Sequence, residues 1–248
     1  FMRIISRLDI KTDILIKSIQ FDGVRKIGNP EEYADKYFKK GVDEVFLINN
    51  TGTLYNTKLS RSVVQNVRSK ISIPIAGGGG ISSVKDAENL IAFGCDKVVI
   101  NSLIHEKPKV FSEIISIFGS SSVVGSVQYS NKKKETTYYK MARESTKLDL
   151  SDTLKKYIDM GCGEILITEI NNDGRYTGLD KELINIINKY NKIPILIGGG
   201  FKGKSDIDIF YNHASAVVIS SALHYKKVSL SDLLEQRNSL SYKNFNKK

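Results

Sequence analysis

Two glycine-rich segments have the composition and position of phosphate-binding turns. Gly78–Gly80 and Gly198–Gly200 each follow a short apolar run. Such a turn leaves backbone N–H groups free to hold an anion, and the start of a following helix adds to the attraction. Either turn alone could be only a tight connection between a strand and a helix. The matched pair predicts two phosphate sites, formed by Gly79, Gly80, Asn101 and Ser102 and by Gly199, Gly200, Ser220 and Ser221.

Asp9 is the first candidate for proton transfer. A carboxylate can act as general acid or base when its neighbours tune its pKa. The residue at the matching place in the second half of the chain is Gln128. Glutamine donates and accepts hydrogen bonds but moves no proton at neutral pH. A mechanism with two carboxylates is therefore not expected on this frame. The alternative for Asp9 is an ion pair with Arg7 or Lys11.

Other polar residues gather after the apolar runs. Asp173 is a further candidate for acid–base chemistry, although Asn171–Gly178 is rich in turn-forming residues and turn capping is the alternative. Lys132–Lys147 is interpreted either as a lid over the site or as a surface loop. The candidates to position a substrate are Lys17, Asn49, Thr168 and Asn171.

An alternation of strands and helices has to position these residues. Segments with apolar residues at helical spacing lie between the short apolar runs, and helices are predicted at 30–40, 60–70, 84–93, 109–118, 151–160 and 180–190. The predicted strands are 4–5, 45–48, 73–76, 98–100, 123–127, 165–168, 193–197 and 217–219. Eight such units predict the α/β class and a (βα)₈ TIM barrel, with its active site at the C-terminal ends of the strands.

The two halves of the chain repeat each other. Gly41–Asn49 returns as Gly161–Glu169, and Ile73–Gly80 returns as Ile193–Gly200, each at an offset of 120 residues. A third segment, Val99–His105, returns as Val218–His224 at an offset of 119. We expect one domain over residues 1–248, built as a half-barrel (βα)₄ duplication with repeats at about 2–120 and 121–240.

Four charged residues begin predicted strands, at the end of the barrel opposite to the phosphate turns. Charges that face the inside of a barrel are costly unless they pair. Two acids and two bases could form a neutral ring that closes the base, and the alternative is a set of surface charges beside the strands. These residues are Arg3, Glu44, Lys97 and Glu164.

Composition narrows the classes of protein. The chain has 248 residues, 41% of them hydrophobic, and a net charge of +10. No apolar run approaches the ~18–20 residues of a membrane helix. The lysines are spread along the chain, so no nucleic-acid partner is expected. Cys95 and Cys162 lie in apolar surroundings typical of buried thiols, and we expect a cytoplasmic protein. The histidines lack metal-ligand spacing, so neither a metal nor another cofactor is expected.

Over nearly its whole length the chain resembles the cyclase subunit of imidazole glycerol phosphate synthase (HisF). The resemblance implies a duplicated (βα)₈ barrel with a HisH-like glutaminase docked at its base. Ammonia from that partner would pass a gate at the four ring positions and cross the barrel to a bisphosphorylated substrate. Family members form imidazole glycerol phosphate and an aminoimidazole carboxamide ribotide. The segments that carry the resemblance are 3–11, 43–51, 77–81, 96–101, 163–168, 172–174 and 198–200.

The chain departs from the pattern that the resemblance implies. The family's catalytic pair is two aspartates; Asp9 matches the first, and Gln128 stands at the second. Asn49 stands where an aspartate is usual, and Arg7 stands at a small residue. Loss of a general acid or base lowers a rate by ~10²–10⁴. The departures predict a diverged paralogue that delivers ammonia to a separate amidotransferase, which would aminate a nucleotide sugar in bacterial surface-sugar synthesis.

Three alternatives stay open. In a histidine-pathway cyclase, Asp9 would share proton transfer with Asp173 or Glu169. The sibling isomerase of the same pathway has the same duplicated barrel but needs no glutaminase, so the ring of charges argues against it. A non-catalytic scaffold would only dock and stimulate a glutaminase.

Overall fold

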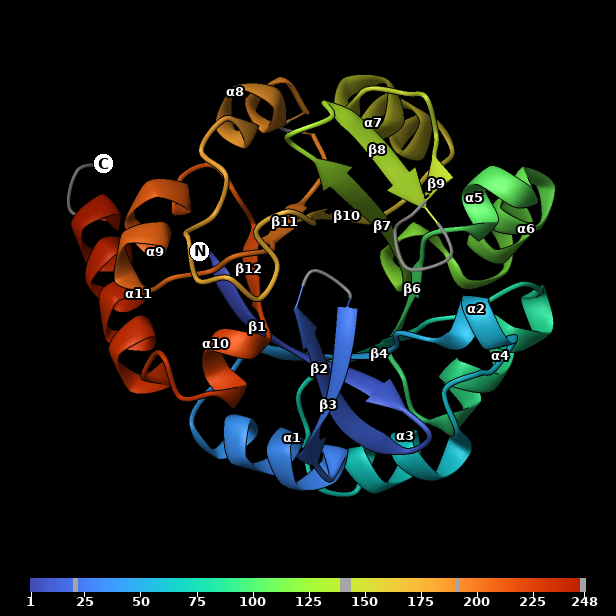
Figure 1. Ribbon diagram of the computed structural model, residues 1–248, viewed down its shortest axis with the longest axis horizontal. Coiled ribbons are helices and arrows are strands. Elements are labelled where there is room, and N and C mark those ends of the chain that lie inside the picture. The colour runs from blue at the N-terminus through green and yellow to red at the C-terminus, as the bar shows by residue number, and fades with distance from the viewer. Residues whose placement is uncertain (20–21, 139–143, 191, 246–248) are drawn as a thin grey trace.

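Eight parallel strands close into a barrel. The computed structural model describes residues 1–19, 22–138, 144–190 and 192–245. Each barrel strand pairs with the next in chain order, and pairing of β12 with β1 completes the closure. Figure 1 shows the strands as an inner ring surrounded by helices. The barrel strands are β1 (Arg3–Lys11), β4 (Glu44–Asn49), β5 (Ile75–Gly78), β6 (Lys97–Ile100), β7 (Val123–Ser130), β10 (Glu164–Glu169), β11 (Ile195–Gly198) and β12 (Ala216–Ile219).

A helix follows each barrel strand, which confirms the predicted (βα)₈ barrel. The helices are α1 (Pro30–Lys39), α3 (Arg61–Arg68), α4 (Val84–Phe93), α6 (Pro108–Phe118), α7 (Leu150–Asp159), α8 (Leu183–Ile187), α9 (Lys204–Phe210) and α11 (Leu230–Phe245). One-turn helices α2 (Gly52–Tyr55), α5 (Leu103–Glu106) and α10 (Ser221–His224) come directly after three strands. The helix predicted at 180–190 is shorter because the Asp180 carboxylate accepts a hydrogen bond from the Glu182 N–H and forms a turn there. Its last three residues form a 3₁₀ turn, η2 (Asn188–Tyr190).

Antiparallel strands that the sequence analysis did not predict extend two barrel strands. β2 (Ile14–Ile19) pairs with β1 and with β3 (Asp22–Gly28). β8 (Glu135–Tyr138) pairs with β7 and with β9 (Glu144–Ser145). The described parts of the segment interpreted as a lid or loop therefore contain strands, and its residues 139–143 lie outside the described residues. Threonines stabilise this second extension, since the buried Thr136 hydroxyl contacts the hydroxyls of Thr146 and Thr153.

Side chains alternate between the inside and the outside of the barrel. Along β1, Ile4 and Leu8 pack in the core beneath the helices, whereas Ile5 belongs to a separate apolar cluster inside the barrel. Arg3, Arg7 and Asp9 share the inward phase of Ile5, because side chains on a strand alternate with period two. β1 thus contributes to the base, the interior and the mouth. The inner apolar cluster comprises Ile5, Phe46, Ala76, Val99, Val124, Leu166, Leu196, Ala216 and Val218, with Ile48 packed against it.

Candidate active site

Two cavities lie at the C-terminal ends of the strands. The first contains Gly79, Gly80, Asn101 and Ser102 in its lining, together with Gln128. The second is lined by residues of β10 to β12 and of the loops that follow them, including Gly199, Gly200, Ser220 and Ser221. All eight residues predicted to bind phosphate therefore line these cavities, four in each. Their binding role stays a prediction.

The glycines of the two turns meet the same steric demand. Gly79 has a φ of +96°, and a Cβ built there would lie 2.1 Å from the Asn49 carbonyl oxygen. Gly199 has a φ of +94°, and its Cβ would lie 2.2 Å from the Glu169 carbonyl oxygen. A side chain fits at neither position. Tight packing against the preceding strand is therefore enough to explain why Gly79 and Gly199 are glycines, without any ligand. The evidence for ligand binding comes from the cavities.

Polar atoms without partners face these cavities. Within the described part of the chain, the N–H groups of Gly80 and Gly200 have no hydrogen-bond acceptor. The buried Ser220 Oγ and Asn101 Oδ1 also have no partner among the described residues. Buried polar atoms are rarely left unpaired in a folded protein, so a ligand or ordered water is the expected partner.

A chain of ion pairs lies between the two cavities. The Arg7 guanidinium donates from Nε to Asp9 Oδ1 at 2.7 Å and from Nη2 to Asn50 Oδ1 at 3.0 Å. The Lys17 ammonium lies 3.1 Å from Asp9 Oδ2 and 3.1 Å from Asp173 Oδ2. Asp9 therefore pairs with Arg7 and Lys17, and the alternative of a pair with Lys11 is wrong.

Asp9 is ionised and hidden. Burial by itself would raise the pKa of its carboxyl, but the Arg7 guanidinium and the Lys17 ammonium outweigh it and lower the pKa from 3.8 to about 2. The Asp9 side chain is 0% exposed and lines neither cavity. Arg7, by contrast, lines both cavities. A molecule in either cavity thus meets the guanidinium and not the carboxylate behind it.

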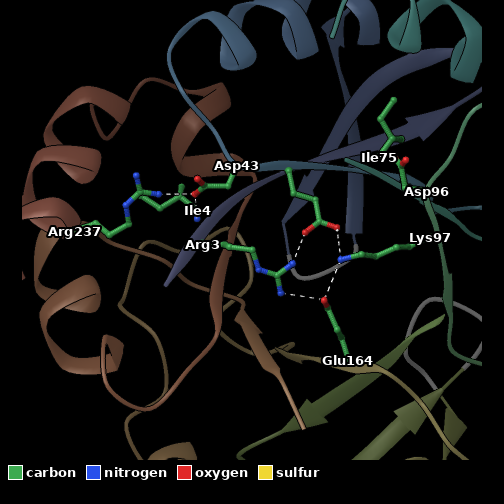
Figure 2. Close-up of polar contacts among 9 residues, drawn as sticks. Arg3, Ile4, Asp43, Ile75, Asp96, Lys97, Glu164 and Arg237 are labelled. Atoms are coloured by element: carbon green, nitrogen blue, oxygen red, sulfur yellow. Dashed lines mark hydrogen bonds and ion pairs between the residues drawn. The ribbon is translucent and has the colours of Figure 1, made fainter. Parts of the chain in front are cut away.

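The four charged residues at the base form a closed ring. Arg3 lies 2.6 Å from Glu44 and 3.0 Å from Glu164, and Lys97 lies 3.0 Å from each of the same two carboxylates. Figure 2 shows the labelled Arg3, Lys97 and Glu164 side chains pointing toward one another. This pairing confirms the predicted neutral ring, and the alternative of unconnected surface charges is wrong. The four residues are the first residues of β1, β4, β6 and β10, so the ring lies at the base of the barrel.

Comparison with known proteins identifies the family. Residues 3–229 match the histidine biosynthesis protein family. The chain is 34% identical over 235 residues to imidazole glycerol phosphate synthase subunit HisF of Petrotoga mobilis, with 93% of each chain covered. It is 37% identical over 203 residues to the subunit of that name from Legionella pneumophila, covering 80% of this chain and 95% of that one. The HisF subunit of Bacillus cereus is 34% identical over 236 residues, with 93% of each chain covered. The chain belongs to the HisF family.

The remaining predicted site residues of this HisF-family chain lie in the first cavity, in the second cavity or outside both. Gln128 and Asn49 line the first cavity, and Thr168 and Asp173 line the second. Gln128 Oε1 is buried and has no partner among the described residues. Asn171 lines neither cavity; its Oδ1 accepts a hydrogen bond from the Ser130 hydroxyl at 2.9 Å. Asn171 therefore lies beside Ser130 at the end of β7, outside the lining of both cavities, and its substrate-positioning role stays a prediction.

Glu169 and Asp173 differ in what they bind. The Glu169 carboxylate accepts hydrogen bonds from the backbone N–H groups of Asn131, Asn171 and Asn172. It thus caps the turn after β10. In the described part of the chain no backbone N–H donates to the Asp173 carboxylate, which contacts Lys17 instead. The turn-capping alternative for Asp173 is therefore wrong, and that role belongs to Glu169.

A histidine behind the mouth was not singled out by the sequence. Nδ1 of the buried His224 forms a hydrogen bond with Tyr37 Oη at 2.8 Å. On the other side of the ring, Nε2 lies 3.1 Å from the Arg7 carbonyl oxygen. Burial lowers the pKa of His224 to about 4, so its ring is neutral at pH 7. His105 likewise contacts a tyrosine, Tyr157, at 3.3 Å. The sequence held one signal for these histidines, since His105 and His224 occupy matching positions in the two repeats.

Two aspartates hold the outside of the base. Asp43 accepts hydrogen bonds from the Ile4 N–H at 2.7 Å and from Arg237 Nη1 at 2.5 Å. Asp96 accepts from the Ile75 N–H at 2.8 Å, in the same relation to a neighbouring strand (Figure 2). Each aspartate directly precedes a ring residue, so these bonds fix the strand ends that carry the ring.

Among the described residues no helix has the length and apolarity to cross a membrane.

Proposed function

We propose that this chain is the cyclase-type barrel subunit of a glutamine amidotransferase of the imidazole glycerol phosphate synthase kind. It would accept ammonia from a HisH-like glutaminase docked at the base and bind a bisphosphorylated ligand at the mouth. The observation that carries this proposal is the pair of matched cavities at one end of the barrel, each with a glycine-rich turn and unpaired polar atoms. The HisF names of its relatives support the same reaction type, a lyase that closes a ring.

Ammonia would enter through the ring of Arg3, Glu44, Lys97 and Glu164. All four ion pairs are formed in the structure, so passage requires at least one pair to separate. Above the ring, the ammonia would cross the inner apolar cluster. An apolar interior favours neutral ammonia over ammonium, because a charge without a partner is expensive there. The docked glutaminase would supply the energy that opens the ring.

At the mouth, we propose that the chemistry has diverged from cyclisation toward delivery of ammonia to a separate amidotransferase acting on a surface sugar. Asp9 is the wrong kind of base for proton transfer near neutral pH, because two cations hold its pKa at about 2 and its side chain is covered. An efficient general base has a pKa near the working pH. Gln128, at the position of the expected second acid, carries no proton to exchange.

Reconstitution tests both parts of this proposal. The chain is mixed with a HisH-type glutaminase, glutamine and the bisphosphorylated imidazole precursor, and glutamate release and ring closure are measured separately. We expect complex formation with stimulated glutamate release, and ring closure at least ~10² slower than in a two-aspartate cyclase. Gln128→Asp should recover part of that rate, and the neutral Gln128→Asn is its matched control. Ring closure at the rate of an ordinary cyclase would exclude divergence, and absence of any complex would exclude the ammonia route.

A histidine-pathway cyclase is the second candidate. Lys17 lies between Asp9 and Asp173, so the two carboxylates are linked through one ammonium and could share proton transfer. Rescue of a histidine auxotroph by this gene alone would favour this candidate. A non-catalytic scaffold, by comparison, would stimulate the glutaminase but bind no bisphosphorylated ligand in calorimetry.

A further inference from the structure

The side chain of Arg7 is the element that the two cavities of the mouth have in common. It lines the cavity beside the first glycine turn and also the cavity beside the second. Arg7 lies on β1, one inward position before Asp9, and its side chain is 12% exposed. The two linings share no other residue among those that the structure describes. The first draws on β4 to β7 and on Leu166 of β10, and the second draws on Thr168 of β10 and on β11 and β12.

Two hydrogen bonds and one backbone contact fix the position of the guanidinium. Nε binds Asp9 Oδ1, and Nη2 binds Asn50 Oδ1. The carbonyl oxygen of Arg7 lies 3.1 Å from His224 Nε2, which holds the backbone at the same residue. In the described part of the chain Nη1 of Arg7 has no acceptor. An arginine anchored along one edge in this way keeps its other donors for a ligand, and arginine is well suited to phosphate.

The charge around Arg7 favours an anion on the open side. Asp9 faces two cations, Arg7 and Lys17, and Lys17 also pairs with Asp173, so each cation is partly neutralised from behind. The residues that line the cavities with Arg7 offer donors without a partner among the described residues, namely the N–H groups of Gly80 and Gly200 and the Ser220 hydroxyl. The amide oxygens of Asn101 and Gln128 are acceptors in the first cavity that also lack a partner within the described part of the chain, but they are neutral. No carboxylate other than Asp173 lines either cavity among the described residues.

We propose that Arg7 is a ligand-contacting specificity residue that serves both phosphate sites from the centre of the mouth. A ligand that occupies both cavities passes over this guanidinium and not over Asp9. Its middle portion must therefore offer a hydrogen-bond acceptor or a negative charge, which selects against ligands that are purely apolar between their phosphates. This inference rests on the proposed phosphate sites and adds to them the residue that joins them.

Titration with inorganic phosphate, followed by calorimetry, tests the inference on the full chain. Ser102→Ala should weaken phosphate binding only at the first cavity, and Ser220→Ala only at the second. In each variant, phosphate binding at the other cavity can therefore be measured. In both backgrounds Arg7→Ser should weaken phosphate binding on the order of tenfold, the loss expected for one charge-assisted hydrogen bond. Arg175→Ser is the matched control, because Arg175 is exposed and lines neither cavity.

A further variant separates ligand contact from a structural role. Arg7→Lys keeps the cation and should recover part of the phosphate affinity, while thermal unfolding reports how far each variant changes the fold. Equal phosphate binding by Arg7→Ser and Arg175→Ser, or a loss at one cavity only, would overturn the shared role of Arg7. Absence of phosphate binding in the unaltered chain would instead refute the proposed phosphate sites, and this inference with them. The two failures are therefore distinguishable.

Discussion

The base and the mouth of the barrel each hold one arginine, one lysine and two carboxylates, but connect them differently. At the base the four pairs close a ring, in which each cation contacts both acids. At the mouth the pairs form an open chain from Arg7 through Asp9 and Lys17 to Asp173. Both arrangements begin on β1, four residues apart, at Arg3 and Arg7.

This difference reverses the direction of the pKa shifts. Burial raises the pKa of Glu44 in the ring, Lys97 and Arg3 offset this rise only in part, and the nearby negative charge of Glu164 adds to it. At the mouth, Asp9 is the carboxylate that Arg7 pairs with, and Lys17 forms a second ion pair with Asp9. The pKa of Asp9 therefore falls despite burial. A closed ring thus satisfies its charges internally, whereas the open chain leaves one edge of Arg7 for another molecule. The ring suits closure and the chain suits anion binding.

Neutralising one carboxylate in each region gives the largest expected contrast. Asp9→Asn removes an ionised partner of two buried cations and should lower the free energy of unfolding by about 2 kcal/mol at pH 7. Glu44→Gln should cost less than about 1 kcal/mol, because the neutral amide avoids the burial penalty on the charge. Urea denaturation at pH 7 measures both. Asp13→Asn is the control, since Asp13 is exposed. A larger loss for Glu44→Gln would reverse the comparison.

The same contrast should depend on pH in a defined window. The folded pKa of Asp9 is about 2, below the ~3.9 of an unfolded aspartate, so its contribution to stability is fully present above pH ~4. It is lost as the pH falls toward about 2. The difference in unfolding free energy between the unaltered chain and Asp9→Asn should therefore shrink over that window. Glu44 has a raised pKa, so protonation favours the folded state, and Glu44→Gln should show no such loss on acidification. Denaturation series from pH 7 to pH 2 distinguish the two behaviours.

The sequence predicted the barrel because its signals are local and periodic. Apolar runs and helical spacing identified the eight barrel strands and six of the eight helices that follow them, while α9 and α11 lie outside the helix ranges named from the sequence. The strand starts also indicated inward positions such as Arg3 and Lys97. The β2–β3 and β8–β9 extensions were missed. β3, β8 and β9 are short and mostly polar, so they lack the alternation that marks a half-buried strand. β2 does contain an apolar run, Ile14–Ile16, which the sequence analysis did not use. The stability of both extensions comes from pairing with β1 and β7, which only the folded chain supplies.

At the candidate site the sequence located residues but not their contacts. All predicted phosphate-turn residues line cavities, because strand ends in a barrel meet at one face. The partner of Asp9 was not decided, since Arg7 and Lys11 have the same strand phase and side-chain direction depends on the rotamer. In the structure Arg7 contacts Asp9, whereas the Lys11 ammonium lies over the Tyr55 ring at 5.7 Å. Lys17 reaches Asp9 through β2, one of the strands that were missed.

The apolar layer between the two charged regions gives the next test. Ala76 is fully buried in the inner cluster, and Ala76→Leu would place three more carbon atoms on the axis. Overpacking of this kind costs about 1–3 kcal/mol. Glutamine-dependent ammonia transfer should fall while glutamate release by the partner continues. Ala92→Leu on α4 is the control, because Ala92 is exposed. Undiminished transfer in Ala76→Leu would show that ammonia does not use the axis.

An exposed ion pair on α1 should contribute least to the free energy of unfolding. Lys39 and Asp35 lie one turn apart on α1 at 2.6 Å, and the lysine side chain is 70% exposed. Solvent screens such a pair, so Lys39→Ala should change the free energy of unfolding by at most about 0.5 kcal/mol. Urea denaturation at low and high salt measures this, with little change expected in either. Removal of Lys97, 16% exposed and bound to two carboxylates, should cost several times more. Similar losses of unfolding free energy for both lysines would mean that the buried, closed ring is no more stabilising than an exposed ion pair. The comparison of base and mouth would then have no support from stability.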